Sequence, residues 1–168
     1  MITLRILTHQ DVPALCSLLI NTVADGGSVS FMHPLSENDA KSFWEKSLDL
    51  SAQGKRVVLG AFNDNTLIST VTLLLDFPPN QPHRAEIGKM MTATSFRGKG
   101  IAGMLLKEAE KIARDKGRWH IVLDTAEDEG AAGFYEKMGY QRIGVIPEFA
   151  LKPYGGLTGT ILFYKKLT

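Results

Sequence analysis

The stretch that decides the fold is Arg84-Ala-Glu-Ile-Gly-Lys-Met-Met-Thr-Ala-Thr-Ser-Phe-Arg-Gly-Lys-Gly-Ile-Ala-Gly103. Residues 84–92 are predicted to form a strand, and a glycine-rich loop at 97–100 precedes a long amphipathic helix. Gly98 and Gly100 allow a ligand to approach the backbone closely, because no Cβ intervenes. The helix N-terminus that follows offers unpaired N–H groups and a positive dipole potential. The stretch therefore predicts a site for an anion or a pyrophosphate.

The same loop satisfies a second pattern, the G-x-G-x-x-G fingerprint of dinucleotide-binding proteins. In that fingerprint the glycines form the turn directly after the strand, whereas here they lie several residues beyond it. The chain after the loop is also too short for a second nucleotide-binding half. A dinucleotide-dependent oxidoreductase is therefore kept only as the weaker alternative.

Outward from this stretch, the chain predicts a single domain, 1–168, with a mixed α/β (α+β) sheet. Hairpin strands come first and β-α-β units follow, which favours a three-layer domain over a fully alternating parallel fold. The spacing Thr8-x-x-Asp11 predicts a capping box at the first helix, and Ser36 with Asp39 predicts the start of the second. The expected strands are 2–7, 56–63, 66–76, 84–92, 119–125, 140–146 and 158–166, and the expected helices are 12–23, 36–54, 101–117 and 129–138.

Composition excludes several classes of protein. The 168 residues carry 19 basic and 18 acidic side chains, a net charge of +1, which disfavours nucleic acid and anionic membranes as partners. The single cysteine, Cys16, rules out an internal disulfide and fits a reducing compartment. We see no signal peptide and no stretch of about 20 apolar residues that would span a membrane. A cytoplasmic protein is expected.

Two motifs carry a resemblance to a known family. Arg97-x-x-Gly100-x-Ala102 resembles the R/Q-x-x-G-x-G/A loop of the GNAT superfamily of acyl-CoA-dependent N-acetyltransferases. Ala131-Ala-Gly-Phe-Tyr-Glu-Lys-Met-Gly-Tyr140 is similar to that superfamily's A-x-x-F-Y-E-K-x-G-F/Y segment. The resemblance implies a central, mostly antiparallel, splayed sheet flanked by helices. It also implies that acetyl-CoA lies in a V between the strand ending near Met91 and the strand ending at Asp124.

A narrower resemblance, to the tabtoxin-resistance acetyltransferases, implies a small amino-acid-like or peptide antimetabolite as acceptor. It is carried by residues 21–32, 84–86, 123–125 and 159–166. One position departs from the superfamily, because Asp128 stands where many members carry an asparagine that helps hold the cofactor. A carboxylate is a poor partner for an anionic cofactor, so a helix cap is the simpler interpretation of Asp128.

Acetyl transfer to an amine through a tetrahedral intermediate needs a neutral amine, a stabilised oxyanion and a proton for the leaving thiolate. Tyr135 is the candidate acid. Its spacing alone favours a core tyrosine, and the resemblance favours the acid. Glu86 and Asp124 are the candidate bases or anchors for an ammonium group, and a backbone N–H near Met90 or Met91 is the candidate oxyanion donor.

Acetyl-CoA is the expected cosubstrate and a small-molecule amine the expected acceptor, with no metal, because the four histidines show no ligand spacing. A homodimer is left open, and so is a non-catalytic acyl-CoA-binding module of the same fold. The residues expected to bind the cofactor are Met90, Met91, Thr92, Arg97, Gly98, Lys99, Gly100, Ile101, Ala102 and Gly103.

Overall fold

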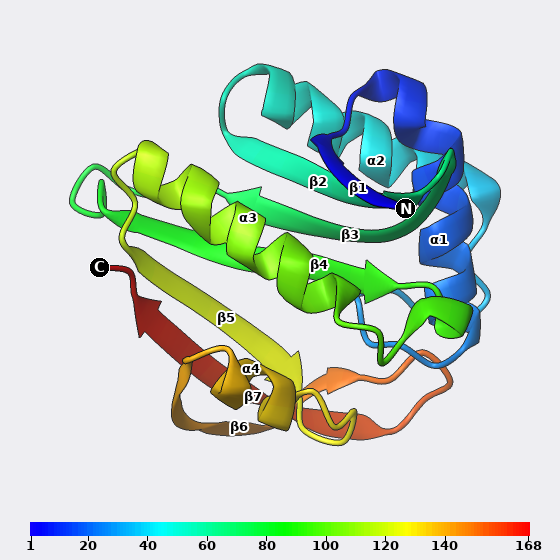
Figure 1. Cartoon of the computed structure of the whole chain (residues 1–168). Helices are drawn as coiled ribbons and strands as arrows, with labels where there is room; N and C mark the ends of the chain where they lie inside the picture. Colours follow the sequence, from blue (N-terminus) through cyan, green and yellow to red (C-terminus); the bar gives the residue numbers. More distant parts are fainter.

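The computed structural model describes residues 1–168 and contains one seven-stranded sheet with helices on both faces (Figure 1). The strand order is β1-β2-β3-β4-β5-β7-β6. All neighbours are antiparallel except β4 and β5, which are parallel. The elements are β1 (Ile2–Ile6), η1 (His9–Asp11), α1 (Val12–Ala24), α2 (Glu37–Ala52), β2 (Arg56–Asn63), β3 (Thr66–Leu74), β4 (Arg84–Thr92), η2 (Thr94–Phe96), α3 (Ile101–Asp115), β5 (His120–Ala126), α4 (Ala132–Lys137), β6 (Gln141–Leu151) and β7 (Leu157–Lys166).

This architecture confirms the predicted fold class, a three-layer mixed domain with a mostly antiparallel sheet. It does not contain the parallel nucleotide-binding sheet that the weaker dinucleotide alternative requires. None of the helices combines the length and the apolar character needed to cross a bilayer.

Two hydrophobic cores lie on opposite faces of the sheet. One is built under α3, where Leu105 and Leu106 are fully buried, and the other under α1 and α2, where Leu19 and Trp44 are fully buried. Alternate residues of a strand point to opposite faces, so a strand covered on both sides is apolar throughout. This explains why the residues of β2 form an almost uninterrupted apolar run in the sequence.

β4 changes its pairing at a bulge that determines the shape of the site. Thr70 of β3 pairs with Met91, but Thr72 pairs with Gly88, so β4 carries one extra residue in this interval. Lys89 takes up the irregularity with a left-handed backbone, φ 49°. The bulge reverses the alternation of side chains. Ile87 consequently belongs to the core under α3, whereas Met91 belongs to the core under α1 and α2.

The parallel pairing of β4 with β5 is short. It joins residues 84–86 of β4 to 120–122 of β5 and then stops, while β5 stays paired with β7 as far as Ala126. Beyond this point β4 and β5 diverge (Figure 1). The splayed sheet implied by the two motifs is therefore present, and Asp124 lies within β5 rather than at its end.

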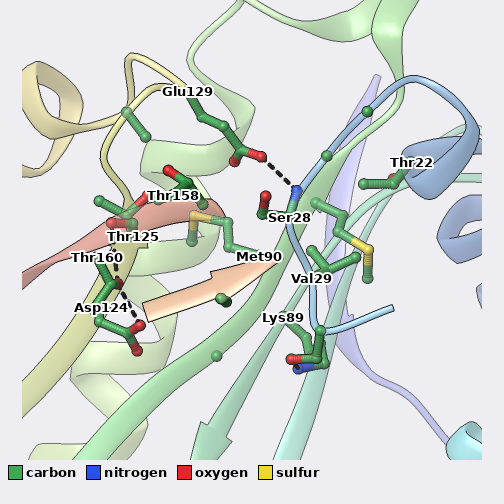
Figure 2. A pocket seen from close by; sticks show the side chains of 18 of the residues that line it. Thr22, Ser28, Val29, Lys89, Met90, Asp124, Thr125, Glu129, Thr158 and Thr160 are labelled. Carbon is green, nitrogen blue, oxygen red and sulfur yellow. Dashed lines mark hydrogen bonds between the residues drawn. The ribbon is translucent and has the colours of Figure 1, made fainter. Parts of the chain in front are cut away.

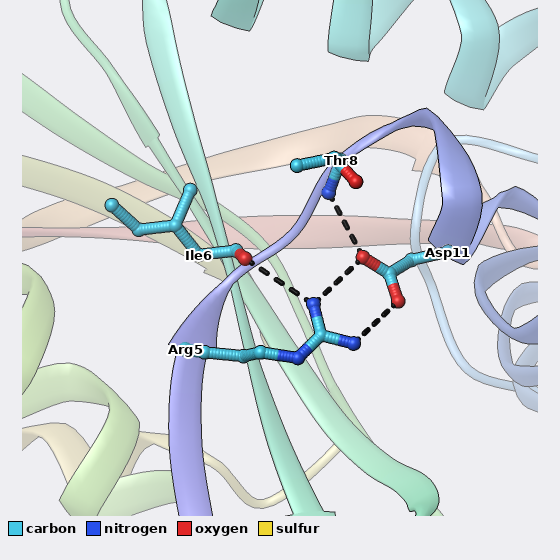
Figure 3. A network of polar contacts seen from close by, with 4 residues as sticks. All are labelled: Arg5, Ile6, Thr8 and Asp11. Atoms are coloured by element: carbon cyan, nitrogen blue, oxygen red, sulfur yellow. Dashed lines mark hydrogen bonds and ion pairs between the residues drawn. The ribbon is translucent and has the colours of Figure 1, made fainter.

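Several boundaries differ from the sequence prediction. The Asp11 carboxylate accepts a hydrogen bond from the Thr8 amide at 2.9 Å, as a capping box requires, but the turn it caps is the 3-10 turn η1. The Arg5 guanidinium also binds both carboxylate oxygens of Asp11, at 2.9 and 2.7 Å, and ties β1 to this turn (Figure 3). Helix α4 is shorter than predicted, and β6 is longer, reaching Leu151.

Candidate active site

A cavity of about 900 Å³ lies where β4 and β5 diverge (Figure 2). Its walls come from β4 and β5, from the loop after α1, from α4, and from the facing ends of β6 and β7. The residues used below are Ser28, Ser30, Lys89, Met90, Met91, Thr92, Arg97, Ala102, Asp124, Glu129, Tyr135 and Thr160. The volume falls in the range of small-molecule sites in proteins, roughly 300–1,000 Å³.

Tyr135 reaches this cavity from α4 and is 7% exposed. Its hydroxyl donates to the sulfur of Met90 across the cavity at 3.7 Å. Burial, with smaller contributions from the charges of Asp124 and Glu129, raises the pKa of Tyr135 to about 12. The phenol therefore keeps its proton at neutral pH, and its only protein acceptor is a thioether, which is a weak one.

The two carboxylates predicted to face the cavity lie in different places. Asp124 lines it, and its Oδ2 accepts a hydrogen bond from Thr160 at 2.7 Å (Figure 2). Glu86 does not line it and instead accepts a hydrogen bond from Arg84 at 2.9 Å. Glu86 pairs with Val122 in the part of the sheet that is still closed. The structure therefore brings Asp124, and not Glu86, together with Tyr135.

The glycine loop borders the same cavity at the N-terminus of α3. Gly98 and Gly100 have left-handed backbones, φ 73° and 80°, and a Cβ atom added to either would meet no protein atom within 4 Å. Backbone conformation, rather than packing against the protein, therefore requires glycine here. No side chain caps α3, so the amides of its first turn remain without a side-chain partner. Arg97 donates from Nε to the Thr92 carbonyl at 3.1 Å and holds the loop against β4.

The ten predicted cofactor residues divide into three sets. Ile101 is 3% exposed and packs into the core, and Gly103 lies close to Met138 and Phe134, so these two position the helix. Gly98, Lys99 and Gly100 form the exposed turn beside the cavity. The members that line the cavity itself are Met90, Met91, Thr92, Arg97 and Ala102.

Lys89 is a cavity residue that the sequence prediction missed. Its ammonium group donates to the Ser30 hydroxyl at 2.9 Å and lies 5.6 Å from the centre of the Phe43 ring. Burial lowers the pKa of Lys89, and the negative charge of Asp124 acts in the opposite direction. The only signal in the sequence was a lysine inside a predicted strand, between Gly88 and two methionines. A regular strand would not place that side chain in the cavity, and the bulge that does so could not be predicted from the sequence.

The loop after α1 is fastened to both sides of the cavity. The Ser28 amide donates to the carboxylate of Glu129 (Figure 2), and Thr94 donates to Asp25 at 2.9 Å. Further along, the Tyr154 hydroxyl donates to the carbonyl of Ala24 at 2.6 Å. The loop thus lies along the cavity and links the β4 side to the β5 side.

Asp128 has a different role from the helix cap expected of it. Helix α4 begins at Ala132 with Ala131 as its N-cap, so Asp128 precedes the helix and does not cap it. Its carboxylate accepts from Lys152 at 3.0 Å and from Thr158 at 2.9 Å, and these hydrogen bonds lower its pKa. Asp128 therefore fastens the β5–α4 connection to β7 and to the turn before it. No group of three or more histidine, cysteine, aspartate or glutamate side chains lies arranged to hold a metal ion.

Comparison with known proteins gives consistent results. A family model described as "Acetyltransferase (GNAT) family" matches residues 26–140. Human N-acetyltransferase 8B is 30% identical over 86 residues, which are 50% of this chain and 38% of that protein. The chain thus matches well under half the length of this curated relative.

Solved structures show the same fold. An N-acetyltransferase from Staphylococcus aureus Mu50 superimposes with a TM-score of 0.85 at 16% identity, covering 100% of this chain and 99% of that one. A structure from Salmonella typhimurium, described with its cofactor acetyl-CoA, superimposes with a TM-score of 0.81 at 15% identity, covering 99% and 94%.

Proposed function

The chain belongs to the acetyltransferase (GNAT) family, and from that premise we propose that it transfers an acetyl group from acetyl-CoA to the amine of a small amino-acid-like or toxin-like molecule. One observation carries the proposal. A glycine loop at an uncapped helix N-terminus, a protonated tyrosine and a carboxylate all border one cavity. Each of these groups answers a separate requirement of acetyl transfer to an amine.

The residues present fit the phosphate end of acetyl-CoA. No protein atom lies within 4 Å of the position that a Cβ would occupy at Gly98 or Gly100, so a ligand can approach the backbone there. The amides of the first turn of α3 are not capped by a side chain. Anions bind at such helix N-termini through the backbone N–H groups and the dipole. Arg97 and Lys99 add positive charge at the same end. The amides of residues 97–103 would hold the pyrophosphate.

Acetyl-CoA, when bound, supplies a thioester whose carbonyl carbon accepts the amine. The acceptor must first lose a proton, and we assign Asp124, one of the carboxylates that line the cavity, to receive it, directly or through water. The bulged segment of β4 lines the cavity at Lys89, Met90 and Met91, and we assign the oxyanion hydrogen bond to an N–H of this segment. Preorganised donors of this kind contribute about 10²–10³-fold to catalysis.

Tyr135 is assigned to the leaving sulfur. The pKa of Tyr135 is raised to about 12, so the phenol is protonated at neutral pH and can act as a donor. Its O–H donates a hydrogen bond as negative charge develops on sulfur, the proton moves to the departing thiolate, and solvent returns a proton to the phenolate. The weak contact with the Met90 sulfur leaves the hydroxyl free to do this.

The toxin-like acceptor is the finer part of the proposal. It is supported by the likeness of four segments to tabtoxin-resistance acetyltransferases and by a cavity with carboxylates in its wall. The single cysteine supports a reducing compartment, and we place the reaction in the cytoplasm.

The test is an acetyl-CoA assay that follows thiol release over a panel of amino acids, short peptides and amino-acid-like toxins. We expect turnover with at least one member and isothermal calorimetry to show acetyl-CoA binding. Acetyl-CoA binding without turnover would support the alternative, a non-catalytic acyl-CoA-binding module. Absence of binding would contradict both.

A further inference from the structure

The Lys89 ammonium group lies in the cavity without a carboxylate partner. It is half-buried, and no aspartate or glutamate oxygen lies within 4.0 Å of it among the ion pairs of the chain. Its one hydrogen bond goes to the neutral Ser30 hydroxyl. A half-buried cation without an anionic partner is unfavourable, because partial burial removes some of the water that would otherwise solvate the charge. An anion that enters the cavity would relieve that cost.

The backbone holds Lys89 in this position at an energetic cost. A left-handed conformation is unfavourable for a residue with a Cβ, and glycine would avoid the cost. Such conformations cluster at ligand-binding and catalytic positions. The residue before Lys89 is a glycine that keeps ordinary backbone angles. The strained position is therefore occupied by a cation where a glycine would be the simpler solution.

Asp124 provides the opposite charge on the other wall. Figure 2 shows Lys89 on β4 and Asp124 on β5, facing the cavity from its two sides. Asp124 is close enough to affect the pKa of Lys89, yet the two do not form an ion pair. Thr160 holds one oxygen of Asp124, and the other has no hydrogen-bond partner in the protein. The cavity thus presents a free anion and a free cation that are separated but near one another.

We infer that the acceptor is a zwitterion, in which the amine to be acetylated faces Asp124 and a carboxylate of the same molecule is bound by Lys89 and Ser30. This inference rests on the proposed function and names its substrate class, a free amino acid or a short peptide-like molecule with an ionised carboxyl group. We call Ser30, Lys89 and Asp124 the acceptor side of the cavity. Lys89 is a specificity-determining residue here, and the remaining lining, which includes Met90 and Phe149, accommodates apolar atoms of the side chain.

A second role for Lys89 makes a different prediction. A lysine of lowered pKa can also act as a general base. A base would be needed equally by acceptors with and without a carboxylate. A carboxylate anchor would be needed only by acceptors that carry one, and its loss would raise KM more than it lowers kcat.

The experiment compares matched acceptors that differ only at the carboxyl group. Each amino acid or dipeptide that the parent protein acetylates is assayed beside its carboxamide, with saturating acetyl-CoA. We expect kcat/KM to be about tenfold or more higher for the acid than for the amide, as for other hydrogen bonds between charged groups. Lys89→Gln should lower kcat/KM for the acid to the level of the amide, mainly through KM, and leave the amide almost unchanged.

Three controls make the result decisive. Lys89→Arg keeps the charge and should retain the higher kcat/KM for the acid. Lys46→Gln removes an exposed charge on α2 and should leave kcat/KM unchanged for both the acid and the amide. Thermal melts establish that each variant is folded. Equal kcat/KM for acid and amide in the parent would overturn the inference and leave the proposed function standing. Loss of kcat for both substrates in Lys89→Gln and Lys89→Arg would assign Lys89 as the base and overturn it as well. No turnover of any amine would instead overturn the proposed function.

Discussion

The glycine loop from Arg97 to Gly103 is one contiguous segment of the chain. The acceptor side of the cavity, in contrast, combines residues from a loop and two strands. The loop depends on local properties, two left-handed glycines and one uncapped helix end. The acceptor side depends on a bulge in β4 and on the divergence of β5. Changes in the loop should therefore affect one ligand, acetyl-CoA, while changes on the acceptor side should affect the other.

Tyr135 lies where the two parts meet, so its loss should have the largest effect. Tyr135→Phe keeps the ring in place and removes the hydroxyl that we assign to the leaving sulfur. We expect kcat to fall by about 10²–10⁴-fold, with acetyl-CoA affinity nearly unchanged in calorimetry. The matched control is Tyr140→Phe, which removes a buried hydroxyl that donates to Glu110 at 2.9 Å outside the cavity. Tyr140→Phe should lower the stability of the fold and leave kcat at the parent value. If Tyr135→Phe also keeps the parent kcat, Tyr135 has a structural role only.

The next largest effect is expected at the glycine loop. Gly100→Glu would place a negative side chain at the proposed pyrophosphate site, and acetyl-CoA affinity should fall by at least about 100-fold, since like charges brought together cost several kcal/mol. Gly117 provides a close control at the other end of α3, with φ 73° against 80° and an equally open Cβ position. Gly117→Glu should be at least as destabilising, because its charge lies near the C-terminal end of the helix dipole. Gly117→Glu should leave the affinity for acetyl-CoA unchanged. If calorimetry shows the same loss of affinity in Gly117→Glu and Gly100→Glu, the pyrophosphate does not bind at the glycine loop.

The two carboxylates test how sharply the acceptor side is defined. Asp124→Asn can keep its hydrogen bond with Thr160 while losing the charge, and we expect kcat/KM for the acceptor to fall about tenfold or more. Glu86→Gln changes a side chain outside the cavity and should reduce kcat/KM for the acceptor by less than about threefold. Steady-state kinetics at saturating acetyl-CoA measures both. A larger effect at Glu86 would show that this carboxylate reaches the acceptor through water.

The smallest effect is expected far from the cavity, in the Arg5–Asp11 pair. The hydrogen bonds from Arg5 lower the pKa of Asp11, so this pair stabilises the fold above the unfolded pKa of about 3.9 and ceases to do so as pH falls through the folded-state value. Because Arg5 is about half exposed, we expect Asp11→Asn to cost about 1 kcal/mol at pH 7. The cost should be smaller at pH 3 than at pH 7, because pH 3 lies below the unfolded pKa and nearer the folded-state pKa, and kcat/KM at pH 7 should not change.

Urea denaturation at the two pH values measures this difference. Asp64→Asn is the control, because Asp64 pairs with the N-terminal amine at 3.6 Å and both groups are more than four-fifths exposed. It should have no measurable effect on stability at either pH. A loss of activity in Asp11→Asn would contradict the separation between this network and the cavity.

The sequence by itself determined the parts of this protein that depend on neighbouring residues. Gly98 and Gly100 mark the turn before α3 because few other residues adopt a left-handed backbone without strain. Apolar periodicity located α1, α2 and α3, and the segment that contains Tyr135 could be recognised because its residues are contiguous. The order of strands and helices was sufficient to predict a mixed three-layer fold, and the mostly antiparallel, splayed sheet was implied by the resemblance of the two motifs.

Only the tertiary structure decided which side chains face the cavity. The bulge at Lys89 is a property of how β4 pairs with β3, and it reverses the faces of all residues after it. The closed stretch between β4 and β5 places Glu86 outside the cavity, and the later divergence places Asp124 inside. Lys152 and Thr158 hold Asp128, although both lie far from it along the chain. Side-chain direction in a sheet depends on pairing with distant strands, and a linear pattern does not contain that information.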